Sequence, residues 1–187
     1  MTKTELEELI DGVAASMVYG LSLMQNAQGD GGEARMVASV ATTGIAFEGP
    51  VPGKGVGMGG AEIHSVFSKP ANLEIVRGNY VFVLRSGLVR LAYEATYHYA
   101  RSNGQLALMK TEPWFYYCRT IRNVISHREH SVLDRWPEDL TKTGVSTMSW
   151  RHRTLTTAEV GKDVEITLYD CWQMYLDIRD FVQGRLT

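Results

Sequence analysis

Apolar residues recur three or four positions apart in several stretches of the chain, which is the spacing of one face of an α-helix. The pattern predicts helices over about residues 4–25, 72–102, 113–127 and 168–182. Capping boxes at Thr4 with Glu7 and at Thr167 with Asp170 predict the starts of the first and last helices. The apolar stripe expected for the first helix consists of Leu6, Leu9, Ile10, Val13, Met17, Leu21 and Met24.

The stretch 72–102 has two interpretations. Its helical stripe would consist of Leu73, Val76, Tyr80, Val83, Leu84, Gly87, Leu91, Ala95 and His98. The residues from Leu73 to Leu84 could instead form two short strands, because many of them favour β-structure. We favour the helix, since the spacing continues unbroken to His98 and Asn103–Gly104 supplies a stop.

Two shorter segments predict other structure. Residues 145–150 and 153–157 are expected to form a hairpin that turns at Arg151–His152. Residues 48–60 hold six glycines and two prolines, and we expect a loop there. Neither a dinucleotide fingerprint nor a P-loop is supported, because prolines stand where a strand is required and no Ser or Thr follows Lys54. The expected fold is mainly α, a helical bundle with a small β-hairpin before the C-terminal helix.

Composition narrows the class of protein. A chain of 187 residues has the size of one domain, or of one domain with a decoration. The formal net charge of −2 excludes a basic coat, so nucleic acid could be bound only through a local patch. The two cysteines, Cys118 and Cys171, are expected to be buried thiols in a reducing compartment. An acidic start and the lack of an 18-residue apolar run predict a cytoplasmic chain that does not span a membrane.

The helix 113–127 concentrates its polar groups on one side. With a step of about 100° per residue, Trp114, Cys118, Ile121 and Ile125 form a core stripe about 60° wide. The opposite side holds Arg119, Arg122, Asn123, Ser126 and His127, and His130 would extend it. Arginine matches phosphate oxygens and histidine transfers protons near neutral pH, so this side predicts phosphate chemistry without a metal. The alternative is a solvated basic face.

The segment Arg122-Asn123-Val124-Ile125-Ser126-His127 resembles the signature of the HEPN superfamily, in which an arginine and a polar residue precede a histidine. The order that follows, Gly144 to Trp150, a short hairpin and a last helix ending in Phe181-Val182, is similar to a HEPN family associated with plasmids and mobile elements. The resemblance covers residues 71–187. Residues 1–70, the first helix and the glycine-rich stretch, would be part of the same domain or a decoration on it.

The resemblance implies a metal-independent endoribonuclease of toxin or defence type. His127 would be the acid or base on the ribose 2′-hydroxyl or on the leaving 5′-oxygen, and Arg122 would hold the scissile phosphate. Asn123 would orient the histidine or the phosphate, and the product would be a 2′,3′-cyclic phosphate. No cofactor is expected. Arg119, Ser126 and His130 are further candidates for phosphate contact from the helical wheel. The alternative is a non-catalytic HEPN protein that binds RNA or serves as a dimeric scaffold.

The resemblance also implies a homodimer that binds RNA. A neutralising partner protein is a further partner that this class of protein can have. Arg122 and His127 are about 140° apart on an ideal helix, so a second copy would complete the site. Phe115 and Tyr116 lie away from the core stripe, and we expect them at the dimer interface. Glu129 stands where HEPN proteins paired with nucleotidyltransferases carry a tyrosine, so no such partner is expected.

Overall fold

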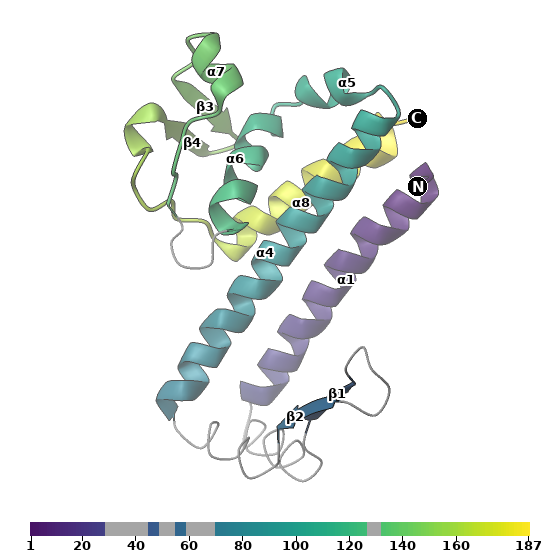
Figure 1. Cartoon of the computed structure of the whole chain (residues 1–187), viewed down its shortest axis with the longest axis vertical. Coiled ribbons are helices and arrows are strands. Elements are labelled where there is room, and N and C mark those ends of the chain that lie inside the picture. The colour runs from purple at the N-terminus through teal and green to yellow at the C-terminus, as the bar shows by residue number, and fades with distance from the viewer. Residues whose placement is uncertain (29–44, 49–54, 59–69, 127–131) are drawn as a thin grey trace. The chain divides into compact units, whose positions relative to one another are not determined.

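A computed structural model describes residues 1–28, 45–48, 55–58, 70–126 and 132–187 (Figure 1). The described part is mainly helical, with a small antiparallel hairpin before the C-terminal helix, as the sequence predicts. Its elements are α1 (Lys3–Gln28), β1 (Ile45–Glu48), β2 (Gly55–Met58), α4 (Pro70–Ser102), α5 (Leu106–Lys110), α6 (Phe115–Ser126), α7 (Glu138–Lys142), β3 (Thr147–Trp150), β4 (Arg153–Thr156), the 3₁₀ helix η1 (Thr157–Glu159) and α8 (Leu168–Gly184).

The chain divides into two compact units, one of residues 1–17 with 84–187 and one of residues 18–83. The boundaries fall within α1 and α4. The smaller unit contains the antiparallel pair β1–β2, in which Ile45 pairs with Met58 and Glu48 with Gly55. The loop expected over 48–60 is therefore wrong at Glu48 and at residues 55–58, because main-chain pairing between β1 and β2 holds these residues extended. The remaining glycines of that stretch (Gly49, Gly53, Gly59 and Gly60) lie outside the described residues.

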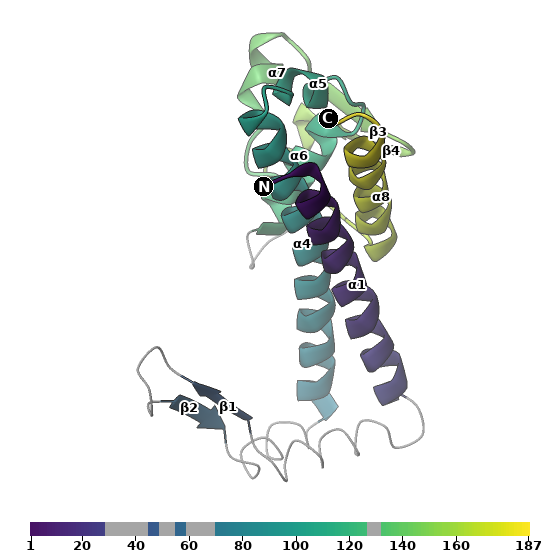
Figure 2. The ribbon, with the colours of Figure 1, turned by 90° about the vertical axis from the view of Figure 1, so that its right-hand side faces the viewer.

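The core of the larger unit lies between three helices that run side by side, the first part of α1, the last part of α4 and α8, together with the inner side of α6 (Figures 1 and 2). The fully buried side chains on these helices include Leu6, Ile10, Leu88, Val89, Ala92, Cys171 and Ile178. Burial of each large apolar side chain contributes roughly 1.5–3 kcal/mol. Hydrogen bonds tie the helices together, since Tyr175 Oη donates to Asp11 Oδ1 at 2.9 Å and Lys3 Nζ to the Leu186 carbonyl at 2.8 Å.

The start and the buried face of α1 differ from the prediction. Its capping box is Thr2 with Glu5, two residues earlier than expected, since Glu5 N–H donates to Thr2 Oγ1 and Thr2 N–H to the Glu5 carboxylate. Leu9 is 46% exposed, whereas Ala14 is buried. The buried stripe runs through Leu6, Ile10, Ala14 and Met17 because it follows contacts with the other helices and not apolar character alone.

The helix interpretation of residues 72–102 is confirmed, and the two-strand alternative is wrong. After α4 the chain turns at Gly104, whose φ of 69° is a backbone conformation that glycine adopts without strain. The predicted buried face is nevertheless wrong, because Leu91 is 49% exposed and Val83 52%. The face that is buried belongs to Leu88, Val89, Ala92, Tyr93, Thr96, Tyr99 and Ala100. This face includes Ala92, Thr96 and Ala100, small or polar residues that are not part of the predicted apolar stripe.

Two short helices, α5 and α7, were not predicted. Residues 111–113, expected to begin the following helix, form a turn in which Thr111 N–H and Oγ1 both donate to the Leu108 carbonyl. The helix α6 consequently begins at Phe115. Both short helices carry a lysine in their last turn, Lys110 in α5 and Lys142 in α7.

The predicted hairpin β3–β4 and the capping box of α8 are both confirmed. Asp170 N–H donates to Thr167 Oγ1 at 3.1 Å, and Thr167 N–H donates to Asp170 Oδ2 at 2.9 Å. The same carboxylate accepts two hydrogen bonds from Arg153 of β4, and Asp177 accepts one from the Trp150 indole at 2.6 Å. These contacts attach the hairpin to α8.

Candidate functional site

The inner side of α6 is packed as its periodicity predicts. Trp114, just before the helix, and Cys118, Ile121 and Ile125 within it are all at most 4% exposed. The buried side is wider than expected, because Tyr117, Thr120 and Val124 are buried as well. This packing fixes the rotation of the helix about its axis, and so determines which side chains of α6 reach the surface.

Phe115 is part of this core, which corrects its assignment to a dimer interface. Its side chain is 0% exposed, and its ring lies 6.1 Å from that of Tyr93 and 5.0 Å from that of Tyr116. A side chain enclosed by its own chain offers no surface to a partner. Tyr116 is half-buried, and its role at an interface stays a prediction.

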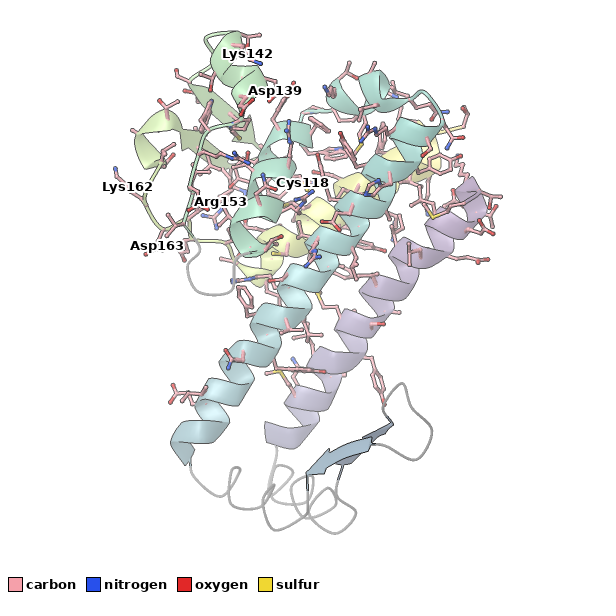
Figure 3. The ribbon with its side chains drawn as sticks, viewed as in Figure 1. Cys118, Asp139, Lys142, Arg153, Lys162 and Asp163 are labelled. Carbon is pink, nitrogen blue, oxygen red and sulfur yellow. The ribbon has the colours of Figure 1, made fainter. Side chains whose placement is uncertain are left out.

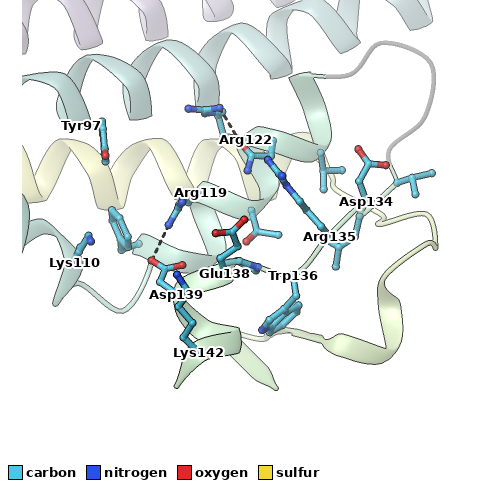
Figure 4. A pocket seen from close by; sticks show the side chains of 17 residues that line it. Tyr97, Lys110, Arg119, Arg122, Asp134, Arg135, Trp136, Glu138, Asp139 and Lys142 are labelled. Carbon is cyan, nitrogen blue, oxygen red and sulfur yellow. Dashed lines mark hydrogen bonds and ion pairs between the residues drawn. The ribbon is translucent and has the colours of Figure 1, made fainter. Parts of the chain in front are cut away.

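The outer side of α6 borders a cleft of about 910 Å³ within the larger unit (Figure 4). The cleft is lined by Tyr97, Lys110, Phe115, Arg119, Thr120, Arg122, Asn123, Val124, Val132, Leu133, Asp134, Arg135, Trp136, Pro137, Glu138, Asp139 and Lys142. Five of these side chains are cationic and three are anionic, so the cleft is locally basic in a chain whose formal net charge is −2. A cavity of this size and charge suits a polar, anionic ligand.

Arg122 is held at the cleft by contacts with three residues. Its Nη1 donates to Asn123 Oδ1 at 2.8 Å, and its Nε lies 3.6 Å from Glu94 Oε1 of α4, an ion pair too long for a hydrogen bond. Its guanidinium carbon lies 5.7 Å from the centre of the Tyr93 ring. These contacts restrict the guanidinium, and a restricted guanidinium binds an anion with little further loss of entropy.

Arg119 makes a second ion pair across the cleft. Its Nη1 donates to Asp139 Oδ2 of α7 at 3.0 Å. Burial raises the pKa of the Tyr116 phenol, and the neighbouring Asp139 carboxylate raises it further. The sequence shows no acid on α6 itself, and the carboxylates that pair with its arginines come from α4 and α7, which sequence reasoning missed.

Several polar atoms at or near the cleft have no hydrogen-bond partner within the described residues. They include Oγ1 of Thr120, a residue only 2% exposed, and Nε of Arg122. The Tyr93 hydroxyl beneath Arg122 is also without a partner, and burial raises the pKa of this phenol so that it stays neutral. Unsatisfied buried polar groups carry a free-energy penalty, which a ligand or water with complementary atoms would relieve.

The structure describes two of the other four predicted site residues, Asn123 and Ser126. Asn123 is exposed and lines the cleft. Ser126 is exposed and donates to the Arg122 carbonyl at 2.6 Å, a contact within one helical turn, and it does not line the cleft. His127 and His130 lie outside the described residues. Their proximity to Arg122 therefore stays a prediction.

Two further observations concern the described part of the chain as a whole. In it, no group of three or more His, Cys, Asp or Glu side chains is arranged to hold a metal ion. No helix in that part of the chain has the length and apolar character of a membrane span.

Comparisons of the chain with family models, with curated proteins and with solved structures gave no match. The candidate function therefore depends on the residues of the cleft and on the sequence of residues 122–127.

Proposed function

We propose that this protein is a HEPN-type, metal-independent endoribonuclease that acts on RNA at the α6 cleft. The observation that supports this most is the adjacent pair Arg122 and Asn123, joined by a hydrogen bond and lining a cleft with four further cationic side chains. A guanidinium in such a setting binds the oxygens of a phosphodiester and stabilises the charge that they gain during cleavage.

In the proposed reaction, His127 removes the proton of a ribose 2′-hydroxyl. The 2′-oxygen attacks phosphorus, the bond from phosphorus to the 5′-oxygen breaks, and the leaving 5′-oxygen takes a proton from a protonated histidine, His127 or its copy in the other subunit of the proposed dimer. The products are a 2′,3′-cyclic phosphate and a 5′-hydroxyl. Arg122 holds the phosphate, and Asn123, bonded to it, sets the orientation of the guanidinium.

The proposal includes a homodimer, because one straight helix directs Arg122 and His127 about 140° apart. A two-fold partner would supply the second histidine and arginine of a shared cleft. A ribonuclease of this kind would act as a toxin or defence effector, held inactive by a neutralising partner protein. Expression of the wild-type chain, but not of His127→Ala, would then arrest growth.

The direct test is cleavage of a labelled RNA in excess EDTA, with the cyclic-phosphate product identified by mass spectrometry. His127→Ala and Arg122→Ala should each abolish cleavage. Two controls should retain it. Arg101→Ala removes a guanidinium that is exposed in the last turn of α4 and does not line the cleft. His152→Gln removes an imidazole that is 61% exposed at the hairpin turn.

A non-catalytic protein that binds RNA is the second candidate. The ion pairs of Arg119 and Arg122 favour it, since both guanidiniums already have carboxylate partners in the structure. Binding of RNA without cleavage, weakened by Arg122→Ala and unchanged by Arg101→Ala, would select this function. If neither Arg122→Ala nor His127→Ala changes cleavage or binding, both functions are wrong.

A further inference from the structure

Most of the cationic side chains of the cleft lie outside the Arg122–Asn123 pair. Lys110, Arg135 and Lys142 also line it, and all three side chains are exposed. None of them makes an ion pair with any residue that the structure describes. Figure 4 shows Lys110 towards one end of the cleft, Arg135 towards the other and Arg119 between them. The cationic groups thus extend along the cleft on either side of a single phosphate site.

Arg119 connects the two halves of this arrangement. It precedes Arg122 by three residues, so the two side chains are neighbours on the α6 surface, about 5–6 Å apart at their Cβ atoms. Only Nη1 of Arg119 is hydrogen-bonded among the described residues, which leaves Nε and Nη2 free to donate.

We propose that Lys110, Arg119 and Lys142 form a second phosphate subsite, which binds the phosphate next to the one held by Arg122. The inference takes RNA as the ligand from the proposed function, but it concerns binding and not cleavage. The three cations come from three separate helices, α5, α6 and α7, which the fold brings to one cleft.

A nucleic-acid strand fits this part of the cleft better than an acidic peptide does. Tyr97 is half-buried and lines the cleft, on the side where Figure 4 also shows Lys110. An aromatic ring beside cationic groups stacks a nucleobase while the cations contact its phosphate. A run of carboxylates has no ring to place there. The cleft's size of about 910 Å³ admits a few nucleotides at most.

The test measures binding of a fluorescent single-stranded oligonucleotide that lacks 2′-hydroxyls and so resists this cleavage. The logarithm of the association constant is plotted against the logarithm of salt concentration. Each lost phosphate contact should reduce the magnitude of the slope by about 0.7. Because the three cations share one phosphate, we expect a reduction of up to about 0.7 for the Lys110→Gln/Lys142→Gln double variant, a smaller reduction for each single change, and a two- to fivefold weaker Kd for each single change.

Lys162→Gln is the matched control, since Lys162 is exposed and does not line the cleft, and Figure 3 shows it well apart from Asp139 and Lys142. It should leave both Kd and slope unchanged. Tyr97→Leu should weaken binding without changing the slope, because a stacked base releases no counterion. Circular dichroism of each variant checks that the fold is retained.

The outcomes separate this subsite from the proposed function. An unchanged slope in the Lys110/Lys142 double variant, or no binding by the wild type, overturns the subsite even if RNA is cleaved. Equal affinity for a polyglutamate of matched charge overturns it in favour of a protein ligand. A reduced slope without any RNA cleavage in EDTA leaves the subsite in place and rejects the ribonuclease.

Discussion

Asp170 is the buried charge on which the attachment of the hairpin to α8 depends most. Its side chain is 2% exposed and accepts four hydrogen bonds. Two come from Arg153, from Nε at 3.1 Å and from Nη2 at 2.6 Å, and two from the backbone N–H and hydroxyl of Thr167. We predict that Asp170→Asn strongly destabilises the fold, because an amide cannot accept all four hydrogen bonds and carries no charge to pair with Arg153.

The size of the effect follows from these contacts. Removal of one partner of a buried ion pair costs about 3–5 kcal/mol. The Arg153 side chain is 28% exposed and can regain water, which places this term at the lower end. Weakening of the capping box adds up to about 1 kcal/mol. We expect a loss of about 3–4 kcal/mol in the free energy of unfolding, which corresponds to a fall in Tm of roughly 6–16 °C for a chain of this length.

Urea and thermal unfolding followed by circular dichroism measure this loss. Asp180→Asn is the control, since Asp180 is exposed on the same helix and should change stability by at most about 0.5 kcal/mol. A loss below about 1 kcal/mol for Asp170→Asn would refute the reasoning, because the carboxylate would then contribute no more than an exposed ion pair.

The same carboxylate should make stability depend on pH. Burial by itself raises the pKa of Asp170, but the hydrogen bonds from Arg153 and Thr167 outweigh it and hold the pKa below its usual range. A group whose pKa is lower in the folded state contributes its full stability above its unfolded pKa, about 3.9 for aspartate. The contribution is lost as the pH falls below that value. The difference in stability between wild type and Asp170→Asn should therefore shrink below about pH 4.

Three further outcomes are expected. Phe115→Ala should destabilise the fold by about 3–5 kcal/mol through the cavity it leaves, with any dimer still present by sedimentation. The thiols of Cys118 and Cys171 should react with a thiol reagent only after unfolding, since burial raises both pKa values, that of Cys171 to about 12. Glu94→Gln should tighten oligonucleotide binding about two- to fivefold, because it removes the anion 3.6 Å from Arg122, and a weaker Kd would contradict the assignment of Arg122 to phosphate.

The helices could be predicted from the sequence more reliably than their buried faces. Periodicity and the Thr167–Asp170 box identify α8, and the unbroken spacing to His98 identifies α4. The face of α4 was missed because apolar residues occupy both sides of the helix. Burial of Ala92 and Thr96 in preference to Leu91 depends on which helices pack there, and a single sequence does not contain that information.

Only the part of the site that lies within the single helix α6 could be predicted from the sequence. The separation of polar and apolar sides on α6 follows from helical geometry, so Arg122 and Asn123 were found. Their surroundings are not local, because Glu94 and Asp139 lie 28 and 20 residues away from the arginines they pair with. A local signal for α7 did exist, in Pro137 followed by two acids and by a stop at Gly144, whose φ is 72°.

The ion pairs of the cleft bear on the length of the ligand as well as on its charge. A single phosphate at Arg122 must compete with Glu94, and one at Arg119 must compete with Asp139. Each of these half-exposed pairs is worth only about 0.2–1 kcal/mol, so a phosphate can displace the carboxylate but gains little by doing so. In the proposed subsite, the favourable free energy of binding comes from the exposed Lys110 and Lys142, which pair with no described carboxylate.

Affinity should therefore be weak for a mononucleotide and rise with each added phosphate until the strand is longer than the cleft. Because the whole chain carries a net charge of −2, no long-range field adds to these local contacts.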